Sequence, residues 1–129
     1  MARRTDRSGY LLDTHVLIWA LENSPRLSQE HRAILSRGDR IFVSPVVLWE
    51  IAAKSAKGKL RLGGDLDVLL EEAGCIELPV TWAHAKRLRS LPSIHQDPFD
   101  RMLVAQAAVE GLVVLTEDKF IRHYPVEVV

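Results

Sequence analysis

The stretch YLLDTHVLIWALE, residues 10–22, decides the fold. It opens with a short apolar run and continues beyond Asp13 with Val16, Trp19 and Ala20 at helical spacing. The stretch therefore predicts a strand that passes directly into a helix close to Asp13. Strand followed by helix is the repeating step of a parallel sheet, because parallel neighbours need a long crossover connection.

The rest of the chain repeats this alternation of strand and helix. Further apolar strands are expected at RIFVS, CIELP, LVVLT and PVEVV, which are residues 40–44, 75–79, 112–116 and 125–129. Helices are expected over residues 44–58, 65–74, 81–91 and 97–111, with Ser44, Thr81 and Asp97 as N-caps and Gly58, Gly74 and Gly111 at the ends. The alternation predicts an α/β domain with a mainly parallel central sheet, and the unbroken apolar strands predict helices on both faces.

Length and composition fit one folded domain. With 129 residues, 47% hydrophobic and 26% charged, the chain is long enough for one core and has little room for a second. We expect a loose basic leader over residues 1–9 and a single domain over residues 10–129. Lysine and arginine together number 17, as do aspartate and glutamate, so the formal net charge is zero. Any surface that binds a polyanion therefore has to be local.

Cysteine usage and hydropathy bear on the compartment. Cys75 is the single cysteine and lies in an apolar setting, which excludes an intrachain disulfide and predicts a buried thiol. No apolar stretch after the basic N-terminus is long enough for a signal peptide or a membrane span. We therefore expect a cytoplasmic protein.

Acidic residues gather where the predicted strands end. Asp13 follows the first strand, and Asp118 lies just beyond LVVLT. Asp97 and Asp100 open the helix that precedes LVVLT. In a parallel sheet the carboxyl ends of the strands share one edge, and ligands bind there. Glu50 differs, because it lies in the second turn of its helix between two apolar residues.

Each acid also has an explanation that needs no chemistry. These local roles are a helix cap for Asp13 and for Asp97, a capping-box-like first turn for Asp100, a turn cap before Phe120 for Asp118, and an ion pair with Lys54 for Glu50. Together, however, they require several acids to meet at one edge by chance, where like charges repel unless protons or cations neutralise them.

The donor set indicates which cation would fit. Oxygen ligands without a matching cysteine or histidine cluster favour a hard cation, Mg²⁺ or Mn²⁺. Such ions held by carboxylates activate water and stabilise the charge that develops on a phosphodiester during in-line attack. The acids therefore predict metal-dependent phosphoryl chemistry.

Four longer segments carry these acids. They are LLDTHVLIW, VSPVVLWEIAAKSAKGKLRL, LPSIHQDPFDRMLVAQA and VVLTEDKFIRHYPV. In this order and spacing they resemble the PIN-domain ribonucleases, and more narrowly the VapC-type toxins of bacterial toxin–antitoxin pairs. The resemblance implies a three-layer α/β fold, Mg²⁺-dependent endoribonuclease activity in which Mn²⁺ can substitute, and products with 5′-phosphate and 3′-hydroxyl ends. It also implies inhibition by a small VapB-like antitoxin and, commonly, a toxin homodimer.

The same resemblance implies roles for individual acids. The family's acidic positions match Asp13, Glu50, Asp100 and Asp118. In the family pattern Asp13 and Asp100 are the leading metal ligands, and Glu50 and Asp118 complete the acidic pocket directly or through water. Asp97 lies outside the most widely shared positions, although HxDPFDR is typical of one subgroup. We therefore expect Asp97 first to cap the helix and support the site.

Several further residues are candidates for accessory roles. Thr14 and Thr116 are expected to hold a carboxylate or a metal-bound water through their hydroxyls. Arg101 is expected to face a phosphate or to pair with a neighbouring acid. A local basic patch is expected to take RNA phosphates or, equally, to be a solvated helix end, and it comprises Lys54, Lys57, Lys59 and Arg61.

One histidine and the three tryptophans have less specific expectations. For His95 we expect a loop histidine bonded to the backbone, with a role in positioning substrate or a proton as the alternative. Trp19, Trp49 and Trp82 are expected in the core or in an interface and not as platforms for bases, because two of them have strongly apolar helical neighbours.

Two other functions compete with the ribonuclease. The first is a catalytically inactive PIN-fold module that binds RNA or protein, in which the acids only cap helices. The second is a receiver-type phosphoacceptor domain, which has similar length and an acid-bound magnesium. It fits less well, because Asp13 has no acidic neighbour and RIFVS does not end in an aspartate. The identity of the RNA and the number of metal ions stay open.

Overall fold

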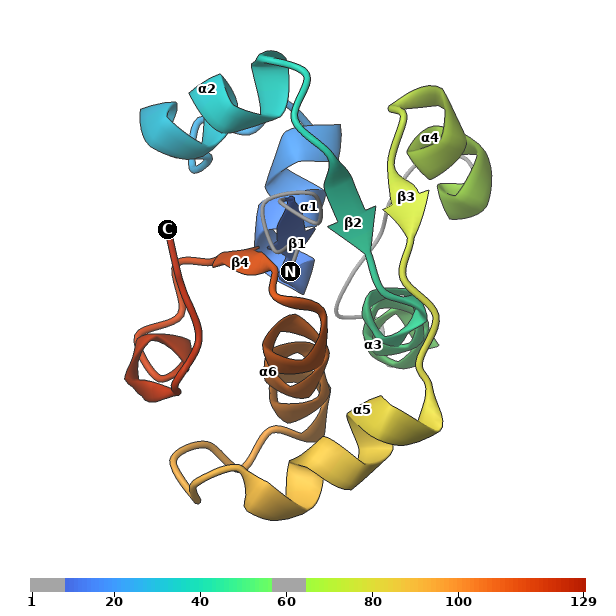
Figure 1. Ribbon diagram of the computed structural model, residues 1–129. Helices are drawn as coiled ribbons and strands as arrows, with labels where there is room; N and C mark the ends of the chain where they lie inside the picture. Colours follow the sequence, from blue (N-terminus) through green and yellow to red (C-terminus); the bar gives the residue numbers. More distant parts are fainter. Residues whose placement is uncertain (1–8, 57–64) are drawn as a thin grey trace.

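The computed structural model describes residues 9–56 and 65–129, and Figure 1 shows how its elements are arranged. The predicted leader, apart from Gly9, lies outside the described residues. So do Lys57, Lys59 and Arg61 of the predicted basic patch, and the predicted helix end at Gly58.

A four-stranded parallel sheet forms the centre of the domain. Its strands are β1 (Tyr10–Leu12), β2 (Ile41–Val43), β3 (Ile76–Glu77) and β4 (Val113–Leu115), in the spatial order β3-β2-β1-β4. In the register, Leu11 of β1 lies between Phe42 of β2 and Val114 of β4. All four strands thus end at the same edge, as the sequence predicted.

Both faces of the sheet are covered. Successive side chains of a strand point to opposite faces, and Leu11 and Leu12 are both buried, as are Val114 and Leu115. The chain steps across the sheet from β1 through β2 to β3 and then returns in one crossover to β4. Because such crossovers are right-handed, connections that run in opposite directions place their helices on opposite faces. The predicted fold class, an α/β domain with a parallel sheet covered on both faces, is confirmed.

Six α-helices and two short 3-10 helices occupy the described part of the chain. They are α1 (Thr14–Leu21), α2 (Gln29–Ser36), α3 (Pro45–Ala56), α4 (Leu66–Glu72), α5 (Trp82–Arg87), η2 (Leu88–Ser90), α6 (Pro98–Glu110) and η3 (Ile121–His123). The helix α6 lies beside α3 and also packs against α5 (Figure 1). In the described ranges no helix is both long and apolar enough to cross a membrane.

Buried contacts on α6 fix the position of its first turn. Five consecutive residues from Leu103 to Ala107 are buried, so the helix contacts neighbours on all sides. The amide of Gln106 donates to the carbonyl oxygens of Leu78 and Pro79, 3.1 and 3.3 Å away. The helix ends at Gly111, whose φ of 71° is a left-handed conformation that glycine adopts without strain. The N-terminal turn of α6 therefore belongs to a helix that is firmly packed against its neighbours.

Three elements of the structure differ from the prediction. The helix α2 was missed, although Ser28 caps it by accepting from the His31 N–H. The predicted strand over residues 125–129 is only an isolated parallel bridge between Val114 and Val128. The helix predicted over residues 81–91 is split, because α5 ends at Arg87 and a 3-10 turn follows.

Candidate active site

Asp13 lies at the junction of β1 and α1. Its side chain is 5% exposed. Its Oδ1 accepts from the Val16 N–H at 2.8 Å, which makes it the N-cap of α1, and its Oδ2 accepts from the Thr116 hydroxyl. Burial raises the pKa of Asp13, while the bonds from Thr116 and Val16 act in the opposite direction. The predicted cap is confirmed, but it uses only one carboxylate oxygen.

Glu50 is held in a similar way. It is 3% exposed, and its Oε1 accepts from the Thr14 hydroxyl. Its Oε2 pairs with Lys54 Nζ at 2.5 Å. The i,i+4 pair predicted from the sequence is therefore present, but Glu50 is a buried acid and not part of a solvated helix face. Thr14 and Thr116 both hold carboxylates, which is one of the two roles predicted for them.

Asp118 follows β4 and belongs to the same network. Its Oδ1 accepts from the Phe120 N–H at 2.8 Å, so the predicted turn cap is present. Its own N–H donates to Thr116 Oγ1 at 2.9 Å. A chain of hydrogen bonds therefore runs from the Asp118 backbone through the Thr116 hydroxyl to Asp13, which orients both acids.

Asp100 lies in the first turn of α6 and does not complete a capping box. The helix is capped by Asp97 alone, whose Oδ1 accepts from the N–H groups of Phe99 and Asp100 at 2.8 and 3.2 Å. The side chain of Asp100 instead lies 3.0 Å from Nε2 of His95, measured at Oδ2. The cap formed by Asp97 thus leaves the Asp100 carboxylate available to the site.

The electrostatics of Asp100 show that the predicted acids converge. Burial, followed by the charges of Asp97, Asp118, Glu50 and Asp13, raises its pKa from 3.8 to about 8. Four other acids, from four parts of the chain, thus act on the carboxyl group of Asp100. Such a group is neutral near pH 7 unless a cation offsets its neighbours. The donor set is therefore suited to a cation.

His95 corrects an expectation. Its imidazole Nε2 lies 3.0 Å from Asp100 Oδ2 and 3.6 Å from Asp118 Oδ2, so the ring contacts acids and not the backbone. Its backbone N–H donates to the Tyr124 hydroxyl at 2.8 Å. In the described ranges, His95, Asp97 and Asp100 form the group with ligand atoms close enough to hold one metal ion, all within 4.8 Å of one another. The spacing HxDxxD was the signal that could have identified this histidine.

Within the described ranges, the predicted basic residues Arg101 and Lys54 have protein partners. The guanidinium of Arg101 donates to the carbonyl oxygens of Pro92 and Leu88 at 2.9 and 3.3 Å, and to the Tyr124 hydroxyl at 3.3 Å. It therefore braces the loop that carries His95, which differs from the predicted contact with phosphate or an acid. Lys54 is the one residue of the predicted basic patch that lies within the described residues, and it pairs with Glu50.

The tryptophans depart from the expectation of core positions. Trp49 is 62% exposed and packs edge-on against Phe99, with ring centroids 4.8 Å apart. Trp82 is 90% exposed. Trp19 is partly buried against the core, as predicted. Trp49 and Trp82 are therefore not core residues, and the interface position that was the other part of the expectation stays a prediction for both.

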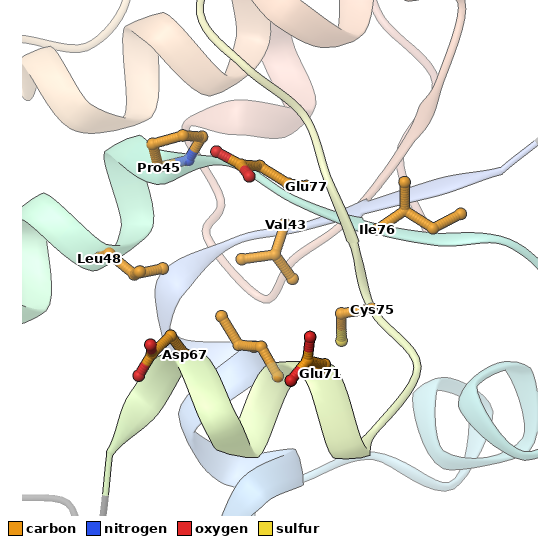
Figure 2. Close-up of a pocket in the computed structure, with 9 residues that line it drawn as sticks. Val43, Pro45, Leu48, Asp67, Glu71, Cys75, Ile76 and Glu77 are labelled. Atoms are coloured by element: carbon orange, nitrogen blue, oxygen red, sulfur yellow. The ribbon is translucent and has the colours of Figure 1, made fainter.

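A second acidic region lies at the opposite end of the strand order. A pocket of about 420 Å³ is formed by α3, α4 and β3, with Val43, Leu48 and other apolar side chains in its wall. Figure 2 shows Asp67 and Glu71 on α4 beside this pocket and Glu77 on the strand opposite. These three acids are exposed. Cys75 also lines the pocket and is half-buried, where a buried thiol was expected, and burial raises its pKa.

Comparison with known proteins assigns the family. A model of the PIN domain matches residues 10–127. The chain belongs to the PIN-domain family. The matched range contains all five acids of the site. The resemblance to PIN domains predicted from the four segments is therefore confirmed.

Individual relatives of this PIN domain point to the VapC group. The chain is 28% identical over 119 residues to Ribonuclease VapC22 of Mycobacterium tuberculosis, which covers 88% of this chain and 90% of the relative. VapBC2 of Rickettsia felis, solved bound to a DNA fragment from its promoter, shares the fold with a TM-score of 0.73 and 18% identity. That match covers 93% of this chain and 96% of the other.

A second solved structure gives the same picture. DNA-bound VapBC of Salmonella typhimurium has a TM-score of 0.66 and 20% identity, over 94% of this chain and 96% of the other. Both structural matches cover nearly the whole of each chain. The PIN domain described here therefore shares the overall fold of these two solved proteins.

Proposed function

We propose that this PIN domain is a Mg²⁺-dependent endoribonuclease and the toxin of a toxin–antitoxin pair. The observation that carries the proposal is the convergence of four acids on Asp100: burial, followed by the charges of Asp97, Asp118, Glu50 and Asp13, raises its pKa to about 8. A cluster that is electrostatically unfavourable without a cation fits a site whose function requires one. The similarity to Ribonuclease VapC22 supports RNA as the substrate.

Asp13 and Asp100 would hold the metal, with Glu50 and Asp118 as direct or water-mediated ligands. Bound Mg²⁺ would supply Lewis-acid stabilisation of the phosphodiester and a water of lowered pKa, and Mn²⁺ would substitute for it. His95 with Asp97 and Asp100 forms an alternative ligand group of suitable spacing. The carboxyl-edge location of these groups agrees with the general position of ligand sites in parallel α/β sheets.

The surrounding residues would keep the ligands in place. The Thr116 hydroxyl fixes Asp13 Oδ2, and the Thr14 hydroxyl fixes Glu50 Oε1. Each hydrogen bond fixes the orientation of a buried carboxylate before the substrate binds. Groups that support metal ligands usually make this contribution. The products would carry 5′-phosphate and 3′-hydroxyl ends, because water would attack phosphorus on the side opposite the 3′-oxygen.

The proposed partners follow from the same relatives. The solved relatives from Rickettsia felis and Salmonella typhimurium are VapBC complexes bound to DNA. We propose that a small VapB-like antitoxin binds this chain and inhibits it, that the toxin itself is a homodimer, and that both act in the cytoplasm. A DNA-binding protein encoded next to this chain should therefore co-purify with it as a hetero-oligomer and suppress cleavage.

Cleavage of structured RNA tests the proposal. The wild-type chain should cut RNA with Mg²⁺ and stop when EDTA is added. Asp13→Asn should abolish cutting while still capping α1, because asparagine caps helices as well as aspartate does. Glu71→Gln, at the exposed rim of the second pocket, is the matched control and should cut at the wild-type rate. Cleavage that survives both EDTA and Asp13→Asn would reject the proposal in favour of a different mechanism.

The non-catalytic alternative is tested by the same assay. A module whose acids only cap helices would bind RNA or protein without cutting it. The burial of Glu50, which caps nothing, speaks against that alternative. Absence of cutting by the wild-type chain at any Mg²⁺ or Mn²⁺ concentration would favour it.

A further inference from the structure

Phe120 is an exposed aromatic ring at the edge of the acid cluster. Its side chain is 53% exposed, although it lies between Asp118 and the buried Ile121. Its backbone N–H donates to Asp118 Oδ1 at 2.8 Å. The backbone that carries the ring is therefore tied directly to one of the proposed ligands.

The ring of Phe120 rests on His95. The two ring centroids are 4.9 Å apart, and the planes are tilted by 31°, which places the rings in direct contact. The imidazole in turn contacts Asp100 and Asp118 through Nε2, at 3.0 and 3.6 Å. A single imidazole thus separates the phenyl ring from the carboxylates.

The support beneath Phe120 is rigid. The His95 N–H donates to the Tyr124 hydroxyl, and Tyr124 is 3% exposed. Arg101 donates to the same hydroxyl, to the carbonyl oxygen of Leu88 in η2, and to that of Pro92 in the loop that precedes His95. His95 lies against the phenyl ring, and Phe120 nevertheless stays 53% exposed. An exposed aromatic face on a fixed support is suited to binding a flat group.

We infer that Phe120, backed by His95, is the stacking platform for a base of single-stranded RNA next to the scissile phosphate. The inference rests on the proposed ribonuclease function and names the form of its substrate. A phosphodiester at Asp100 and Asp118 brings its flanking nucleotides beside this ring. Bases within a duplex have both faces covered by their neighbours, so only an unstacked base can use the platform.

Substitutions of Phe120 separate stacking from simple apolar contact. Phe120→Ala removes the ring, Phe120→Leu keeps an apolar side chain of similar size without an aromatic face, and Phe120→Trp enlarges the face. Trp82→Ala is the matched control, because it removes an aromatic ring that is 90% exposed on α5, a helix that contributes none of the five acids. Thermal unfolding of each variant should stay near that of the wild type, because Phe120 is largely exposed.

The probe is a short mixed-sequence, single-stranded oligoribonucleotide containing 2-aminopurine, with Ca²⁺ in place of Mg²⁺. Stacking on Phe120 should quench the 2-aminopurine fluorescence. Phe120→Ala and Phe120→Leu should both weaken binding by about 5- to 100-fold, which is the range for loss of one base–aromatic stack. Phe120→Trp and Trp82→Ala should bind as the wild type does, and a duplex of the same sequence should not compete for the site.

In the cleavage assay, Phe120→Ala should raise KM by a similar factor with little change in kcat. Equal RNA binding by the wild type and Phe120→Ala would overturn the platform. The platform would also be overturned if Phe120→Leu bound RNA as the wild type does, or if Phe120→Ala lost binding only to a protein partner. If the wild-type chain cuts RNA and the variants give any of these results, only the platform is refuted. A wild-type chain that neither cuts nor binds RNA refutes the proposed function with it.

Discussion

The domain has two acidic regions that differ in almost every physical respect. In the site at the carboxyl edge of the sheet, Asp13 and Glu50 are buried and bonded to threonine hydroxyls. Burial, followed by the charges of the neighbouring acids, raises the pKa of Asp100 there to about 8. Around the pocket of Figure 2, Asp67 and Glu71 are exposed on the surface of α4.

The difference shows what marks a candidate metal site. Acidic composition is common to both regions, so composition alone does not separate them. Desolvation and mutual repulsion distinguish the first, because they make the ionised cluster costly without a cation, whereas water screens the acids of the second. Substitutions matched across the two regions therefore test the account.

Loss of a proposed ligand should have the largest effect. Asp13→Asn or Asp100→Asn should lower kcat/KM for RNA cleavage by more than about 100-fold, since loss of a merely supporting partner already costs about 10- to 100-fold. Glu71→Gln should stay within about 2-fold of the wild type. Initial rates with excess Mg²⁺ measure this contrast. Equal losses in both regions would mean that the two acidic regions do not differ in function.

Loss of a supporting hydroxyl should have an intermediate effect. Thr116→Val leaves Asp13 Oδ2 and the Asp118 N–H without the bonds they now make. We expect a loss of about 10- to 100-fold in activity or metal affinity. A buried unpaired polar group also costs about 1–3 kcal/mol in the free energy of unfolding.

Thr116→Ser is the control for that prediction, because it keeps the hydroxyl. Urea denaturation and cleavage rates measure the two effects separately. If Thr116→Val cut RNA as fast as Thr116→Ser, the hydroxyl would have no part in holding Asp13 for function.

The pH dependence of stability without metal should show a smaller contrast. The ordinary pKa of an aspartate side chain is 3.8, and the pKa of Asp100 in the folded chain is about 8. Between about pH 4 and about pH 8 the folded state binds more protons than the unfolded state, so stability falls as pH rises through this window. Asp13, whose pKa is also raised, acts in the same direction. Asp100→Asn cannot lose a proton and should decline less.

Melting temperatures in EDTA measure this effect. The Tm of Asp100→Asn minus that of the wild type should grow as pH rises toward about 8, while Glu71→Gln should follow the wild type at every pH. A difference between Asp100→Asn and the wild type that stays constant with pH would contradict the raised pKa of Asp100.

Much of the fold could be predicted because its signals are local. The starts of three helices are marked by Asp13, Thr81 and Asp97. Each of these side chains accepts a hydrogen bond from an N–H group two or three residues later in the chain, so the sequence alone indicates the contact. The helix α2 was missed because its sequence is mostly polar, and only His31 and Ile34 of its residues are buried. Residues 125–129 were predicted as a strand because the segment is apolar. In the structure only Val128 bridges to β4, and this isolated contact is too short to form a strand.

The site was predictable to the extent that parallel strands share an edge. That rule placed Asp13, Asp97, Asp100 and Asp118 together from their positions after strands and before a helix. The burial of Glu50 depends on how α3 packs, which no local pattern encodes. The contact of His95 with Asp100 lies within the local HxDxxD spacing, but that spacing alone does not fix which way the imidazole ring points. The exposure of Trp49 and Trp82 has the same origin, since an apolar neighbourhood in sequence does not fix which way a helix faces.

A titration of Mg²⁺ followed by thermal unfolding tests the central claim most directly. Because a ligand that binds only the folded state stabilises it, by about 2.7 kcal/mol at 100 times its Kd, the Tm of the wild-type chain should rise with Mg²⁺. The rise should be unchanged in Glu71→Gln and lost in Asp13→Asn and Asp100→Asn. A wild-type chain whose Tm does not respond to Mg²⁺, or a response that survives both asparagine variants, would contradict the assignment of these acids as the metal site.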